Sequence, residues 1–194
     1  FGAIAASDDS IFYVQNSDDE DTLRRFLQDG TAQAEYQLQG RSFAFPLLAP
    51  GGLLFCVTWD AVNEDGERDE IIGLDAQTLQ LRHRFGLGLL NGAQQLAVVA
   101  DELYVCDTHN NRLQVFSLTG EHRRSITGAW RLPERLCCAK DRLYLVEDAE
   151  DGDEAYESQG RRILVLSLQG DILQVVTHPS EPAVIFSSIC CFDD

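Results

Sequence analysis

Residues 105 to 120 read VCDTHNNRLQVFSLTG, and this stretch decides the fold. Apolar residues come first, a polar hexapeptide follows at 107–112, and a second apolar run ends in a Thr-Gly pair. Two short apolar runs joined by turn-forming residues are typical of neighbouring antiparallel strands. The stretch therefore predicts a strand, a tight turn and a second strand.

The same pattern recurs along the chain. Strands that carry an aromatic residue align as SIFYVQ (10–15), LLFCVT (53–58), ELYVCD (102–107) and RLYLVE (142–147). The strands that follow them align as LRRFLQDG (23–30), IIGLDAQT (71–78), RLQVFSLTG (112–120) and RILVLSLQG (162–170). A period of about 40 to 50 residues that holds four short strands is typical of a propeller blade. We therefore predict an all-β propeller of four-stranded antiparallel blades, at about 1–40, 41–90, 91–130 and 131–180, with the first strand of a further blade at 181–194.

The blade around the opening stretch closely resembles the NHL repeat, in which a Val-x-Asp strand end precedes a polar turn with Asn and Arg. The matching residues are Val105, Asp107, Asn110, Arg112, Val115, Phe116 and Gly120. The resemblance to NHL-repeat propellers of the tripartite-motif/NHL type is clearest in residues 93–178. It implies a six-bladed ring, of which this sequence supplies about four blades and one strand. The first two blades keep the strands but lose the turn motif, and a rival WD40 interpretation rests only on Trp59-Asp60.

Two roles compete for the hexapeptide. In the structural role, Asp107 and Asn110 bond the backbone amides of the loop and Arg112 ties the turn to a neighbouring strand. In the chemical role, His109 and Asp107 form an acid-base pair or bind a metal. Catalysis also needs a positioned third group, which the sequence does not offer. We therefore expect structural blade-turn residues, and no catalytic residue, metal or cofactor.

Charge excludes several classes of partner. The chain has 15 basic and 32 acidic residues, which gives a net charge of −17. Such a field repels nucleic-acid phosphates and anionic lipid headgroups, and no apolar run is long enough to span a membrane. We expect no nucleic-acid partner and no direct membrane insertion. Because the sequence contains no methionine, we also expect it to be a piece of a longer or processed chain.

Six cysteines invite a disulfide or metal interpretation. In the repeat alignment, however, both vicinal pairs, Cys137-Cys138 and Cys190-Cys191, fall opposite Val98-Val99. Cys56 and Cys106 also occupy positions that other blades fill with apolar or aromatic residues. Buried thiols behave as small hydrophobes, so we expect all six to be free core residues. This favours a reducing compartment such as the cytoplasm.

Acidic insertions separate the second and third strands of three blades. They read NSDDED (16–21), NEDGERDE (63–70) and EDAEDGDEAYES (147–158). An EF-hand pattern fails in both Gly-containing loops, because Ala61 and Ala149 occupy ligand positions. Propeller topology places such loops on one face, where they either are simply solvated or bind a basic protein. We expect the second, through Asp18, Asp19, Glu20, Asp65, Glu67, Asp69, Glu147, Asp148, Glu150, Asp151, Asp153, Glu154 and Glu157.

Function must be argued from this face, because propellers host enzymes and scaffolds alike. The resemblance to NHL proteins implies a non-catalytic interaction scaffold, and acidity favours a protein partner within a larger assembly. Two alternatives stay open. One is a metal-dependent propeller enzyme of the lactonase or lyase kind, and the other is the substrate-recognition propeller of a ubiquitin ligase.

Overall fold

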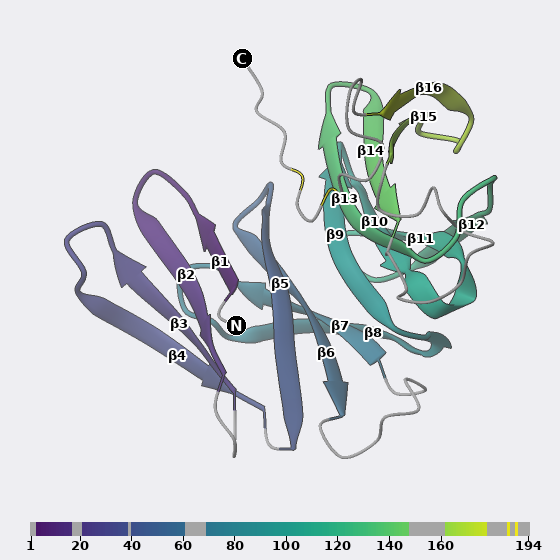
Figure 1. Ribbon diagram of the computed structural model, residues 1–194. Coiled ribbons are helices and arrows are strands. Elements are labelled where there is room, and N and C mark those ends of the chain that lie inside the picture. Colours follow the sequence, from purple (N-terminus) through teal and green to yellow (C-terminus); the bar gives the residue numbers. More distant parts are fainter. Residues whose placement is uncertain are drawn as a thin grey trace. The chain divides into compact units, whose positions relative to one another are not determined.

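The computed structural model describes residues 3–16, 21–38, 40–60, 69–147, 162–177, 186 and 189. Within them the chain forms sixteen β-strands and one short 3-10 helix, η1 (Thr108–Asn110). The strands follow one another as meanders along the colour gradient of Figure 1. In this part of the chain, no helix has the length and apolar character needed to cross a membrane.

Each set of four consecutive strands forms one antiparallel sheet, which we call a blade. Blade one contains β1 (Ala3–Ala6), β2 (Ser10–Gln15), β3 (Thr22–Leu27) and β4 (Ala32–Gln37). Blade two contains β5 (Arg41–Ala49), β6 (Leu53–Asp60), β7 (Asp69–Asp75) and β8 (Leu81–Leu90). Blade three contains β9 (Ala93–Val99), β10 (Glu102–Asp107), β11 (Arg112–Ser117) and β12 (His122–Ile126). Blade four contains β13 (Pro133–Ala139), β14 (Arg142–Glu147), β15 (Arg162–Ser167) and β16 (Ile172–Thr177).

The predicted fold class is confirmed. The aligned aromatic-bearing segments are the second strands β2, β6, β10 and β14, and each pairs with the strand expected to follow it. The predicted first strand of a further blade, at 181–194, lies outside the described residues except for Phe186 and Ile189.

Every blade carries a β-bulge at the same point, between its third and fourth strands. The pairing register shifts between Arg25 and Phe26 in blade one, and at the corresponding point in the other three blades. The extra residue on the fourth strand is Gln33, Arg82, Arg123 or Leu173, in blade order. A bulge bends a strand and increases its twist, so the outer strands share one local geometry.

The chain divides into two compact units, Phe1–Gly92 and Ala93–Asp194. In the first unit, alternate apolar residues of blades one and two pack together in one core, which includes Phe12, Leu23, Leu54 and Ile72. Alternate residues of a strand point to the same face of its sheet, so this core lies on one face of each blade. Arg25 joins the blades, because its guanidinium donates to the Gln77 backbone oxygen at 3.1 Å and to Gln77 Oε1 at 2.7 Å.

The second unit has a similar core, and an arginine again joins its two blades. Tyr104, Leu113 and Val115 of blade three pack against leucines of blade four. Arg124 donates to both carboxylate oxygens of Glu102 and lies 5.7 Å from the centre of the Tyr104 ring. It also reaches the Leu168 backbone oxygen of blade four at 3.3 Å. The arginine thus holds the pKa of Glu102 down at about 2, while burial raises the pKa of Tyr104 to about 12.

Candidate partner-binding face

The turn between β10 and β11 is organised around one buried carboxylate. Asp107 is fully buried, and it accepts hydrogen bonds from three side chains. Asn110 Nδ2 lies 3.0 Å from Oδ1, Arg112 Nε lies 2.7 Å from Oδ2, and Gln114 Nε2 lies 3.2 Å from Oδ2. The prediction named backbone amides as partners of Asp107 and did not foresee these three side chains. Ion pairing and hydrogen bonding together offset the cost of burying the charge.

Asn111 ends this turn in a left-handed conformation, with φ of 54°. Asparagine tolerates that region better than most residues, which explains its place directly after η1. Its side-chain oxygen accepts a hydrogen bond from Leu132 N at 2.7 Å. Thr108 Oγ1 donates to the Pro133 backbone oxygen at 2.7 Å. The β10–β11 turn is therefore fastened to the segment that enters blade four.

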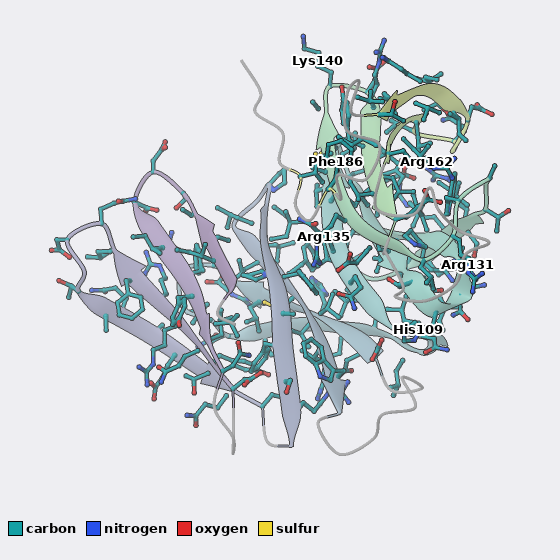
Figure 2. All side chains as sticks on the ribbon, in the orientation of Figure 1. His109, Arg131, Arg135, Lys140, Arg162 and Phe186 are labelled. Atoms are coloured by element: carbon teal, nitrogen blue, oxygen red, sulfur yellow. The ribbon has the colours of Figure 1, made fainter. Side chains whose placement is uncertain are left out.

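Blade four repeats this arrangement around a longer insertion. Glu147 ends β14, and it is only 2% exposed. Arg162 begins β15 and donates through Nε to Glu147 Oε2 at 2.6 Å and through Nη2 to Oε1 at 2.9 Å. This bidentate contact raises the pKa of the Arg162 guanidinium. Arg131 N also donates to Glu147 Oε1 at 2.8 Å. Glu147 and the β10–β11 turn therefore contact the same segment, which enters blade four. Arg131 and Arg162 are labelled in Figure 2.

The first unit also buries carboxylates at the strand ends that border its acidic loops. Asp21 is 4% exposed and accepts from Asn16 Nδ2 at 2.9 Å and from Phe43 N at 3.0 Å. Glu70 is 5% exposed, and its Oε1 accepts a hydrogen bond from Arg84 Nη2 at 2.5 Å. It also forms an ion pair with Arg41 Nε at 3.4 Å. The partners on β5, Arg41 and Phe43, are only two residues apart. The strand ends next to both acidic loops therefore lie at one end of this unit.

Two residues assigned to the acidic surface by sequence lie inside the protein instead. Glu147 is buried by its pairing with Arg162, and Asp69 is 4% exposed at the start of β7. Because both carboxylates are buried, neither residue is available to contact a partner directly. The other eleven surface residues lie outside the described residues: Asp18, Asp19, Glu20, Asp65, Glu67, Asp148, Glu150, Asp151, Asp153, Glu154 and Glu157.

Sequence reasoning missed Asp21 and Glu70. Both stand next to or within acidic runs, which made them look like ordinary surface charges. The signal that distinguishes them is their position at the start of a strand: Asp21 directly precedes β3, and Glu70 is the second residue of β7. Their amide and arginine partners come from other segments, so the composition of the loops does not reveal them. In the described ranges, no group of three or more His, Cys, Asp or Glu side chains is placed to hold a metal ion.

The cysteine prediction needs one correction. Cys56 and Cys106 are free and fully buried, and burial raises the pKa of Cys56 to about 12. Cys138 is free and half-buried, and its thiol donates to the Val98 backbone oxygen at 3.0 Å. Cys137, however, is disulfide-bonded, and its partner lies outside the described residues. Neighbouring strand residues point to opposite faces, so a vicinal pair can hold one core thiol and one disulfide.

The four meandering blades define a β-propeller protein, and solved structures support this class. The chain superposes on the WD40 propeller domain of Doa1 with a TM-score of 0.67 and 14% identity, covering 97% of this chain and 56% of that one. For regucalcin, a calcium-binding protein of Agrobacterium tumefaciens, the TM-score is 0.63 and the identity is 17%, over 91% of this chain and 60% of that one. For virginiamycin B lyase of Staphylococcus aureus the TM-score is 0.63 and the identity is 16%, over 93% of this chain and 56% of that one. The chain therefore spans 56 to 60% of the length of these structures.

Within this class, residues 90–116 match the NHL repeat family model. The match covers β9, β10, η1 and nearly all of β11, so it contains the Asp107 turn. The predicted resemblance to NHL-repeat propellers is thus confirmed at the blade where it was clearest. No curated protein resembles the chain closely enough in sequence to count as a relative.

Proposed function

We propose that the chain is a non-catalytic protein-binding propeller whose acidic loops recruit a basic surface of another protein. One observation carries the proposal. In the first unit, the strand ends that border both acidic segments contact the start of β5, at Phe43 and Arg41. In the second unit, Glu147 next to the long acidic segment and Thr108 of the β10–β11 turn contact Arg131 and Pro133. In the first unit, both acidic segments therefore adjoin strand ends at the same end of the two blades.

The chemistry of the buried carboxylates favours binding over catalysis. Asp107 already accepts from three side chains, and Glu147 accepts a bidentate arginine and a backbone amide. A general base or metal ligand needs an oxygen lone pair directed at substrate or metal. These carboxylates instead direct their oxygens at the turn itself. Because the similar structures include both enzymes and binding domains, the fold alone does not decide between the two roles.

With Glu147 assigned to the turn, six carboxylates remain in the 148–158 part of the longest acidic segment, without a lysine or arginine among them. They are Asp148, Glu150, Asp151, Asp153, Glu154 and Glu157. Clustered charge of one sign attracts an oppositely charged surface and increases the rate of encounter. The partner is therefore a protein with a basic patch, held in a larger assembly.

A capture experiment tests this function. The bait is the chain itself, compared with a variant in which Glu150, Asp151, Asp153, Glu154 and Glu157 become Gln or Asn. We expect basic proteins to be retained by the wild type at low salt and lost with the variant. Equal retention by both baits would refute the role of the acidic segment. A stoichiometric divalent metal in the purified protein would favour the enzyme alternative.

A further inference from the structure

Cys137 and Cys138 are neighbours on β13, but they face opposite sides of blade four. In the register of β13 with β14, Cys137 pairs with Tyr144 and Cys138 pairs with Leu143. Leu143 belongs to the core that blades three and four share, and Cys138 packs against that core. Successive residues of a strand point to opposite faces of its sheet, so Cys137 lies on the face of blade four turned away from blade three.

The disulfide partner of Cys137 is one of two residues. The chain has six cysteines, and the described free ones are Cys56, Cys106 and Cys138. Cys137 is disulfide-bonded, which leaves Cys190 and Cys191 as its possible partners. Both of these lie outside the described residues. The disulfide therefore joins the outer face of blade four to the C-terminal vicinal pair.

The boundary between blades three and four indicates which of the two cysteines is placed to form this bond. There the thiol of Cys138 on β13 donates to the Val98 backbone oxygen on β9 at 3.0 Å, and Ala97 lies in the same core. Ala97 and Cys137 each pair with the aromatic residue of the second strand in their own blade. Cys137 therefore occupies the position in blade four that Ala97 occupies in blade three.

We propose that Cys191 is the partner, and that its disulfide with Cys137 fastens the predicted first strand of a further blade, at 181–194, to the outer face of blade four. The stretch LCCA at 136–139 aligns with ICCF at 189–192, so Cys191 takes the position of Cys138. The thiol of Cys138 faces the preceding blade beside Val98, the neighbour of Ala97. At the next boundary Cys137 replaces the alanine, and two thiols meet there.

This disulfide makes the attachment sensitive to redox conditions. A dithiol reductant breaks the S–S bond by exchange: its own two thiols become a disulfide, and Cys137 and Cys191 each become a thiol. The face that carries Cys137 is apolar, because it also carries Val146 and Val165, which are 0% and 3% exposed. Reduction therefore frees the attached segment from this apolar face. A disulfide between blades also implies folding in an oxidising compartment, whereas the sequence favoured a reducing one.

Peptide mapping tests the pairing. Free thiols are blocked in denaturant without reductant, and trypsin then releases residues 136–140, with the first vicinal pair, and 163–194, with the second. We expect these two peptides to be linked in the wild type, and fragmentation of the linked product to locate the bond at Cys137 and Cys191. The link should be lost in Cys191→Ser and kept in the matched control Cys190→Ser. Unlinked wild-type peptides, or a bond located at Cys190, would overturn the proposal.

Amide exchange tests the redox response of the attached segment. In the oxidised wild type and in Cys190→Ser, residues 183–191 should exchange slowly, and a dithiol reductant should speed this exchange at least about tenfold. In Cys191→Ser the same residues should exchange rapidly with or without reductant. Residues 102–107 of β10 serve as the internal control, because release of the segment, unlike unfolding of the unit, should leave their exchange unchanged. Equal exchange of residues 183–191 in oxidised and reduced wild type would contradict the redox-sensitive attachment.

Discussion

Arg162 forms a bidentate ion pair with Glu147 across the whole acidic insertion, just as Arg112 pairs with Asp107 across the four-residue turn of the preceding blade. The two pairs occupy equivalent strand ends, so the 148–161 segment enlarges a blade turn without altering its base. This relationship explains how a blade can carry a long acidic segment and still keep its sheet.

Arg162→Met should therefore destabilise the fold. The substitution leaves the Glu147 carboxylate buried without its main cation, which costs about 3 kcal/mol when one partner of a buried pair is removed. Urea unfolding measures the loss. The control, Arg82→Met, breaks a pair in which the arginine side chain is 51% exposed, so it should cost about 0.5 kcal/mol. An equal loss of unfolding free energy in the two variants would show that the Glu147–Arg162 pair does not stabilise the strand ends at the acidic insertion.

Acid should weaken the contact between blades three and four. In the folded protein the pKa of Glu102 lies at about 2, mainly because Arg124 donates to it, against an ordinary value of 4.5. The stability that this lowered pKa provides is complete above pH 4.5 and is lost as the pH falls toward 2. Glu102→Gln keeps the side-chain shape but cannot titrate. Thermal unfolding from pH 6 to pH 3 should thus show a smaller acid loss in the variant, and identical pH profiles would contradict this assignment.

Thiol titration tests the disulfide at Cys137. Without reductant, denatured protein should react at no more than about four of its six cysteines, because one disulfide removes two thiols. After reduction, all six should react. Native protein should react more slowly still, because Cys56 and Cys106 are buried and hold raised pKa values. Six reactive thiols in unreduced denatured protein would show that Cys137 is free.

Gly128 makes room for the indole of Trp130, which is 6% exposed in the core of the second unit. A Cβ at position 128 would lie 1.9 Å from an atom of that ring, so the ring must move. Gly128→Ala should lower stability by about 1 to 3 kcal/mol and shift tryptophan emission to longer wavelength. Gly30→Ala, where a Cβ meets nothing within 4 Å, should leave the emission unchanged. An unshifted Gly128→Ala spectrum would contradict this packing.

The sequence predicted the blades well because the repeat itself constrains them. Phe12, Phe55 and Tyr104 recur at one strand position, and all three are buried. The bulges were not predicted, because Gln33, Arg82, Arg123 and Leu173 share no chemical character. Glu147 was placed on the surface because it continues an acidic run, and only the three-dimensional position of Arg162 reveals its burial. The acidic segments themselves were recognised by composition, and their role as a binding surface stays a prediction.

The most direct test of partner recruitment is the association rate of the captured partner as a function of salt. The five-carboxylate variant of 150–157 removes charge from the loop but leaves the Glu147–Arg162 base intact. Steering by clustered charge acts mainly on the on-rate, so the variant should associate about tenfold more slowly than wild type at low salt, with a flatter salt dependence and an unchanged unfolding midpoint. If variant and wild type associate at the same rate at low salt, the acidic loops do not recruit the partner.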